Sequence, residues 1–232
     1  NQKYKNLEIL FHDDSSTDNS LKIIKKYKKV KVIKNKVRSN FGSYNQINAL
    51  KKLFKKSSGE ILFLLDSDDY FSTKKINRIM KVFNSNKSLI AIYDLPILKF
   101  PNKSLFVKNK GKILNNFWPY IPPQSCISIK RKNFKSIIDS INIRKFPDIW
   151  MDFRIAIYLK YIIKNFYVHS ENLTFYRQSP NMISSRFKHL SFFWWKRRLQ
   201  AHNYIKYYFN KNQITYKKNL DYYITIITNK FL

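Results

Sequence analysis

Three carboxylates follow directly on an apolar run in this chain. The run, residues 61–65, is preceded by Gly59 and leads into Asp66, Asp68 and Asp69. Such a run predicts a strand that is buried on both faces of a parallel sheet, and ligands bind at the carboxyl ends of these strands. Closely spaced carboxylates are costly to ionise without a cation or hydrogen-bond donors, so a Mg²⁺ or Mn²⁺ bridging to phosphate is the natural partner. Asp68 and Asp69 equally suit the start of the next helix.

A second acidic cluster follows a second strand candidate, residues 7–11. Asp13 and Asp14 open a polar loop that reaches Ser20. The carboxyl ends of neighbouring parallel strands lie at one edge of a sheet. We therefore expect the two acidic clusters to face a single cleft.

Strand and helix candidates alternate through the first 94 residues. Further strands are expected at residues 30–34 and 89–93, and helices at residues 43–56, 73–84 and up to about residue 29. This alternation predicts an α/β fold with a mostly parallel sheet and flanking helices. Later elements are a strand at 127–130, helices at 134–141 and 148–164, and short strands at 166–169 and 173–177. Asp148 and Asp152 are four residues apart on one of these helices and should share a face.

The C-terminal part of the chain, from Leu190 onwards, is expected to be helical and is rich in aromatic and basic residues. Three interpretations stay open for it: aromatic side chains that pack on the domain while the cations stay solvated, a membrane-surface helix, or a nucleic-acid platform. We expect one domain at residues 1–188 and a basic, aromatic helical appendage at residues 189–232.

The chain is strongly basic, with a formal charge of +31 from 45 Lys and Arg against 14 Asp and Glu. The lysines occur in every segment, which fits a sequence-wide bias as well as a surface for nucleic acid or anionic lipid. Cys126 lies in an apolar run and is expected to be a buried free thiol. No apolar run approaches the roughly 18 residues of a membrane span, and the start as given has no signal peptide. These features favour a cytoplasmic protein, with peripheral contact at the inner membrane face.

Several motifs, taken in order, resemble family 2 glycosyltransferases of the GT-A fold. The resemblance is strong over residues 1–95 and weaker over 120–180. It implies a Rossmann-like nucleotide-binding half, a nucleotide-diphospho-sugar donor, Mg²⁺ or Mn²⁺, and inverting transfer to the hydroxyl of a glycan or lipid-linked acceptor in cell-surface polysaccharide or lipopolysaccharide synthesis. The motifs are residues 4–9, residues 13–20, Gly59 with Glu60, and residues 66–70.

The resemblance also implies roles for individual residues. Asp14 matches the acid that contacts the nucleotide base, with Asp13 as a supporting acid. Asp66 and Asp68 match the family's DxD motif, which makes Asp68 the metal ligand and places Asp66 at the ribose or sugar side. Asp69 is expected to support them.

Two further roles come from the same resemblance. Asp152 is the expected catalytic base and Asp148 its substitute, although an acid in the first turn of a helix is also ordinary. Arg177 suits a phosphate as a charged fork, or it lies in solvent at a strand end.

The chain departs from the family pattern at its start. The family's first strand is not present ahead of Asn1, so the sheet is expected to lack a central strand. Two alternatives to a transferase therefore stay open. One is a non-catalytic remnant of such an enzyme. The other is a basic nucleic-acid-binding protein, which the sequence supports less well than it supports a transferase.

Overall fold

The computed structural model describes residues 2–108, 117–142, 145–179 and 187–232. A single turn of 3₁₀-helix at Gln124–Cys126 and a π-helical turn at Tyr158–Ile163 accompany the regular elements. The regular elements are β1 (Ile9–Asp13), α1 (Ser20–Ile24), β2 (Val30–Lys34), α2 (Gly42–Lys56), β3 (Ile61–Phe63), β4 (Tyr70–Phe71), α3 (Lys75–Ser85), β5 (Ala91–Lys99), β6 (Ser104–Phe106), β7 (Ile127–Lys130), α4 (Arg131–Ser140), α5 (Met151–Ile157), β8 (Phe166–Arg177), α6 (Phe192–Lys211) and α7 (Leu220–Phe231).

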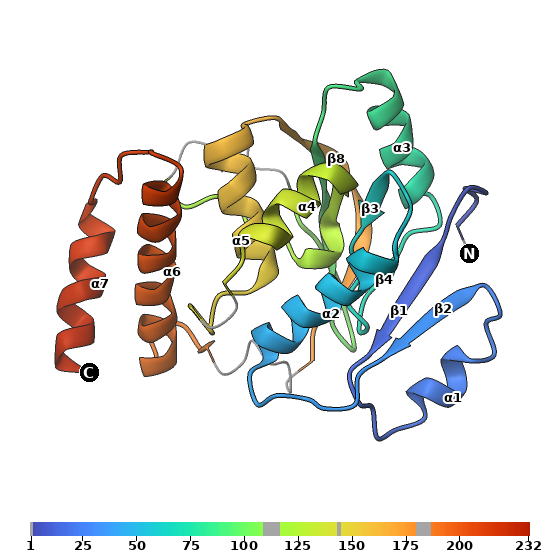
Figure 1. The fold of residues 1–232 in the computed structure, drawn as a ribbon, viewed down its shortest axis with the longest axis horizontal. Coiled ribbons are helices and arrows are strands. Elements are labelled where there is room, and N and C mark those ends of the chain that lie inside the picture. Colours follow the sequence, from blue (N-terminus) through green and yellow to red (C-terminus); the bar gives the residue numbers. More distant parts are fainter. Residues whose placement is uncertain (1, 109–116, 143–144, 180–186) are drawn as a thin grey trace.

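The strands form two sheets with helices around them (Figure 1). β1 and β2 form a parallel pair, and the other six strands form a sheet in the order β3-β7-β5-β8-β4, with β6 beside β5. Within the larger sheet only β5 and β8 run parallel, and the remaining pairs are antiparallel. The predicted α/β class with flanking helices is confirmed, but the larger sheet is mixed in direction because hydrophobic patterns do not encode strand pairing.

The strand that precedes the acids is shorter than predicted. β3 ends at Phe63 and lies at the edge of the sheet, where it pairs only with β7. Ile61 and Phe63 pack against one apolar cluster and Leu62 against the other, so both faces are covered in part. The edge position keeps these residues half-buried, and Leu65 is 48% exposed.

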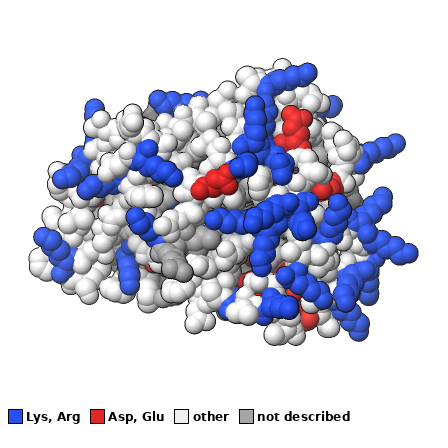
Figure 2. Space-filling model, viewed as in Figure 1, with Lys and Arg blue, Asp and Glu red and all other residues white. Residues whose placement is uncertain are grey.

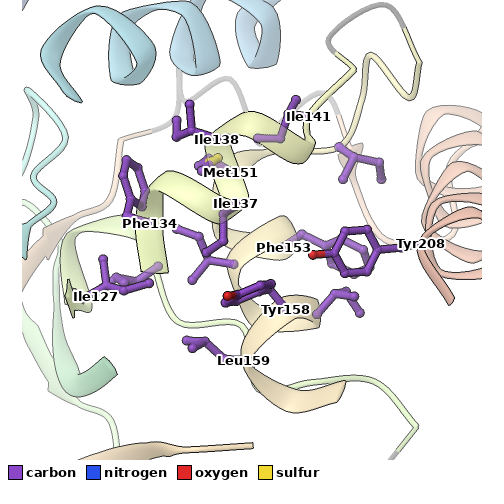
Figure 3. Packing of buried hydrophobic residues seen from close by; sticks show 14 of the residues in the cluster. Ile127, Phe134, Ile137, Ile138, Ile141, Met151, Phe153, Tyr158, Leu159 and Tyr208 are labelled. Carbon is purple, nitrogen blue, oxygen red and sulfur yellow. The ribbon is translucent and has the colours of Figure 1, made fainter. Parts of the chain in front are cut away.

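The main core lies between the sheet and helices from the second half of the chain. Figure 3 shows Phe134 and Ile137 from α4 and Phe153 from α5 in one cluster, with Tyr208 from α6 beside them. A smaller cluster packs α3 on the sheet through Ile79 and its neighbours. These two layers hold the ends of β3, β4, β7 and β8 in fixed positions.

Helix α6 packs on the domain through its aromatic side chains. Tyr204, Tyr208 and Phe209 are almost fully buried in the main core, so the packing interpretation is confirmed for α6. Helix α7 lies antiparallel beside α6 at one end of the molecule (Figure 1). Among the described residues, no helix combines the length and apolar character that crossing a bilayer requires.

Several predicted boundaries are wrong. α1 ends at Ile24 instead of extending to about residue 29. β8 is one strand of 12 residues where two short strands were expected. β5 continues through Pro96 because the pairing with β8 shifts register at that point, and a proline is tolerated where a ladder is irregular.

Candidate functional site

The acidic loop after β3 meets two other segments because of the strand pairing. β3 and β7 are antiparallel, so the end of β3 lies beside the turn Gln124–Cys126 that leads into β7. β4 and β8 are also antiparallel, with Tyr70 opposite Phe175. The loop at residues 66–69 is therefore held between the start of β7 and the end of β8.

Asp69 anchors this loop. Its side chain is buried, with the residue only 7% exposed. Ser125 Oγ donates a hydrogen bond to Asp69 Oδ2 at 2.6 Å, and the backbone N–H of Arg177 donates to Oδ1 at 3.0 Å. Both carboxylate oxygens are thus engaged by protein, which fits the supporting role expected for Asp69.

Asp66 faces the other acids. Its backbone N–H donates to Ser125 Oγ at 3.0 Å, and Gln124 Nε2 donates to Oδ1 at 2.5 Å. Burial first, and then the carboxylates of Asp69, Asp152 and Asp68, together raise the pKa of Asp66 to about 7. A proton or a cation is therefore favoured at this point.

Asp152 joins these acids from a distant part of the chain. It lies in the first turn of α5, is half-buried, and accepts a hydrogen bond at Oδ1 from the N–H of Phe153 at 2.7 Å. Burial raises the pKa of its carboxyl, and Arg197 of α6 opposes that rise. We call Asp66, Asp68, Asp69 and Asp152 the acid cluster.

Tyr176, near the end of β8, lies close enough to all four acids to be affected by their charges. Burial raises the pKa of the Tyr176 hydroxyl to about 12, and all four carboxylates of the acid cluster contribute to the rise. The end of β8 therefore lies within the electrostatic field of the whole acid cluster.

Asp148 is not part of the acid cluster. Gln200 Nε2 donates to Asp148 Oδ2 at 2.6 Å, and the N–H of Asp148 donates back to Gln200 Oε1 at 3.0 Å. The prediction that Asp148 and Asp152 share a helix face is wrong. The backbone is still extended at Trp150 and α5 begins only at Met151, so Asp148 lies before the helix. Asp148 is thus engaged by Gln200, although both Asp148 and Asp152 lie near Arg197.

Asp13 and Asp14 lie at the end of β1, in the smaller sheet. Asp14 accepts a hydrogen bond from Asn35 Nδ2 at 3.0 Å and lies 3.4 Å from Arg38 Nε. Asp13 is 3% exposed. Across the described residues, no hydrogen bond or ion pair joins either acid to the acid cluster, so their expected convergence on one cleft stays a prediction.

Arg177 lies against the acidic loop. The residue is exposed at the end of β8, and its Nε donates to the backbone carbonyl of Asp68. With the contact of its own N–H to Asp69, this places the guanidinium beside the acid cluster. The interpretation as an Arg free in solvent is therefore not supported.

A buried ion pair between Lys75 and Asp94 lies next to the turn that holds the acidic loop. Lys75 Nζ lies 2.6 Å from Asp94 Oδ1, and both side chains are fully buried. Lys75 also donates to the carbonyl oxygen of Ser125 at 2.6 Å and to Thr174 Oγ1 at 2.7 Å. Because Ser125 also binds Asp69, this network fixes the loop to the core. Burial raises the pKa of Asp94, and Lys75 opposes the rise.

Sequence reasoning missed Gln124, Ser125, Lys75 and Arg197. The one available signal was Asp94, a lone acid within the apolar run 91–97, because a buried acid requires a cation such as Lys75 beside it. Gln124 is 5% exposed, and its Oε1 has no hydrogen-bond partner among the described residues. Cys126, the last residue of the turn Gln124–Cys126, is the buried free thiol that was predicted.

The residues fit a cation that is shared with a ligand. Over the described ranges, no three His, Cys, Asp or Glu side chains form a metal site by themselves. Mg²⁺ is commonly held by one or two carboxylates together with substrate phosphates and water. Asp68 is exposed, and the neighbouring carboxylates already disfavour the charge on Asp66. A cation bound jointly by these acids and a diphosphate would relieve that repulsion.

Comparison with known proteins gives several relatives that are glycosyltransferases by name. An uncharacterised glycosyltransferase of Nostoc sp. is 28% identical over 195 residues, which is 76% of this chain and 57% of the relative. A UDP-Glc:alpha-D-GlcNAc-diphosphoundecaprenol beta-1,3-glucosyltransferase, WfaP of Escherichia coli, is 38% identical over 88 residues, which is 37% of this chain and 33% of WfaP. The chain thus spans between a third and three fifths of these relatives.

The fold has solved counterparts. The crystal structure of S. aureus TarS residues 1–349 in complex with UDP-GlcNAc superposes with a TM-score of 0.58 at 16% identity, over 87% of this chain and 59% of that one. A second crystal structure of S. aureus TarS residues 1–349 gives a TM-score of 0.57 over 98% of this chain. This likeness confirms a GT-A-type architecture. Residues 1–145 match the family described as Glycosyl transferase family 2. The chain therefore belongs to glycosyl transferase family 2.

Proposed function

We propose that this chain transfers a sugar from a nucleotide-diphospho-sugar to an acceptor hydroxyl with inversion at the anomeric carbon. The observation that carries the proposal is the acidic loop after β3, which Arg177 contacts at Asp68 and Asp69, with Asp152 of α5 near enough to raise the pKa of Asp66. Membership of a glycosyltransferase family supports it. Such a site can hold a diphosphate at one side and activate a hydroxyl at the other.

The donor is proposed to be a uridine diphospho-sugar. TarS has been solved with UDP-GlcNAc and with UDP, and the name of WfaP specifies UDP-Glc as donor. The acceptor of WfaP is a sugar on diphosphoundecaprenol. We extend this to the present chain as a glycan or lipid-linked acceptor in cell-surface glycan synthesis.

Asp152 is proposed as the catalytic base. Its carboxylate takes the proton of the acceptor hydroxyl while the acceptor oxygen forms a bond to the anomeric carbon. The bond from that carbon to the diphosphate oxygen breaks, and the nucleoside diphosphate leaves with the electron pair. Burial raises the pKa of Asp152 and so strengthens it as a base, while Arg197 favours the ionised form that the reaction needs.

The remaining residues are proposed to hold the donor. Asp68, with Asp66 beside it, would hold Mg²⁺ or Mn²⁺, and this cation would neutralise charge on the departing diphosphate. Arg177 would bind a phosphate oxygen through its guanidinium. Asp14, with Asp13 behind it, would contact the nucleotide base at the end of β1.

The test compares two aspartates of the same segment. Release of UDP from UDP-GlcNAc and from UDP-Glc is measured with Mn²⁺ for the parent chain and for Asp152→Asn and Asp148→Asn. Loss of the base should slow release by about 10²–10⁴-fold without weakening donor binding in calorimetry, whereas Asp148→Asn should retain the parent rate. Full activity of Asp152→Asn would refute the base, and the absence of any nucleotide binding would favour the non-catalytic remnant.

A further inference from the structure

Helix α7 packs on α6 by one face and exposes apolar side chains on the opposite face. Its inner face packs on α6, with Thr225 buried and Asn229 Nδ2 donating to the carbonyl of Trp195 at 3.1 Å. At 3.6 residues per turn, the outward side chains fall within an arc of about 100°. They are Leu220 (74% exposed), Tyr223 (50%), Ile224 (44%), Ile227 (56%) and Phe231 (86%). We call these five residues the outer face of α7.

The orientation of α7 is fixed by polar contacts on its inner side. Asp221 Oδ1 accepts from Arg198 Nε at 2.9 Å, and Asp221 Oδ2 lies 2.8 Å from His202 Nε2 and accepts from Trp118 Nε1 at 3.1 Å. Asn219 caps the helix by accepting from the N–H of Tyr222. With the inner face tied in this way, the outer face cannot turn toward the core, and the described residues leave it exposed.

The surroundings of the outer face carry positive charge almost exclusively. Residues 187–232 contain seven Lys, two Arg and one acidic residue. That acid is Asp221, which is neutralised internally by Arg198. Lys217 and Lys218 immediately precede α7, Lys230 lies in its last turn, and all three are exposed. Figure 2 shows Lys and Arg side chains densest on the side of β1, β2 and α1, with several also at the end of the molecule where α7 lies.

We propose that the outer face of α7 binds the surface of an anionic lipid membrane. An amphipathic helix lies in the interface when it combines an apolar stripe with flanking basic residues. The aromatic rings of Tyr223 and Phe231 suit the headgroup boundary, and Lys217, Lys218 and Lys230 pair with anionic headgroups. Charge complementarity selects the membrane over a second copy of this chain, since two copies would place like charges together. The inference does not depend on the transferase activity.

The experiment uses a fluorescent reporter placed on the outer face. Cys126 is fully buried and its thiol pKa is raised by burial, so Ile227→Cys can be labelled selectively with an environment-sensitive dye. Phe106→Cys, at a β6 position that is 65% exposed, is the matched control. Phosphatidylcholine vesicles with and without phosphatidylglycerol are added at near-physiological salt. We expect a blue shift only at position 227, and only when phosphatidylglycerol is present.

Two sets of variants distinguish the contribution of the outer face of α7 to vesicle binding from that of the overall charge of the chain. Ile224→Ser with Phe231→Ser should weaken binding to the anionic vesicles by at least about tenfold, because the apolar area that enters the interface is lost. Lys217→Glu with Lys218→Glu should weaken it more than Lys25→Glu with Lys26→Glu, a pair of equal charge change on the far side of the chain, after α1.

Three results would overturn the proposal. The first is binding to vesicles with no shift at position 227. The second is a shift that depends on protein concentration without vesicles, which would assign the face to a second copy. The third is an equal shift with double-stranded DNA in place of vesicles, which would assign it to nucleic acid.

Discussion

Replacement of Asp66 by Asn should make the folded chain more stable at neutral and alkaline pH. The pKa of Asp66 is raised from its ordinary value of 3.8 to about 7, first by burial and then by Asp69, Asp152 and Asp68. A difference of this size corresponds to a cost of about 4 kcal/mol for the ionised side chain in the folded state. The Asn side chain carries no charge, and its oxygen can still accept the hydrogen bond from Gln124.

The sign of the pH dependence follows from proton binding. Between about pH 4 and about pH 7 the folded chain holds a proton on Asp66 that the unfolded chain has lost, so the free energy of unfolding falls as the pH rises. Above that window Asp66 is ionised in both states and the full cost is present. The stability gained by Asp66→Asn should therefore be near zero at about pH 4 and reach about 2–4 kcal/mol at about pH 8.

Urea denaturation followed by circular dichroism at several pH values measures this difference. Asp139→Asn is the matched control, because Asp139 is exposed in an ion pair with Lys135. That pair should contribute less than about 1 kcal/mol at any pH. If the advantage of Asp66→Asn does not grow with pH, the repulsion inferred for the acid cluster is absent, and the reason for expecting a cation there is lost with it.

Three further changes test the supporting structure. Lys75→Met should destabilise the chain by about 3–5 kcal/mol in urea denaturation, because it leaves the buried Asp94 without its cationic partner; failure of Asp94→Asn to recover stability in the double variant would contradict this. Asp221→Ala should lower the free energy of unfolding by about 1–3 kcal/mol. It should also speed amide hydrogen exchange in α7 but not in β5, whereas an equal increase in both would argue that the contacts of Asp221 with Arg198 and His202 do not hold α7 on α6. Gln124→Leu should raise the pKa of Asp66 further, because the amide hydrogen bond lowers it; an unchanged carboxyl titration in NMR would be inconsistent with that bond.

The sequence is sufficient to predict those parts of the site that lie in one short stretch. The acids at 66–69 follow an apolar run, and this local pattern predicts both the strand and the loop that β3 and its turn form. The helix from Gly42 to Lys56 was predicted to within one residue, since its apolar spacing is regular. The candidate base Asp152 came from the family resemblance, not from periodicity.

The contributions of distant segments could not be predicted in this way. Gln124 and Ser125 reach the acids because β3 and β7 pair antiparallel, and no local pattern specifies which strands pair or in which direction. The burial of Lys75 depends equally on contacts made across the sheet. Asp148 was misplaced for a local reason, since Pro147 and an extended Trp150 delay the start of α5 by three residues.

Calorimetric titration of UDP into the chain, with and without Mn²⁺, tests most directly whether the acid cluster holds the donor diphosphate. We predict that binding requires Mn²⁺ and weakens by at least about tenfold in Asp68→Asn. Asp18→Asn, an exposed acid in the loop before α1, should bind like the parent. Equal affinity for UDP in the presence and absence of Mn²⁺, unchanged in Asp68→Asn, would contradict a shared cation site and remove the basis for sugar transfer at these residues.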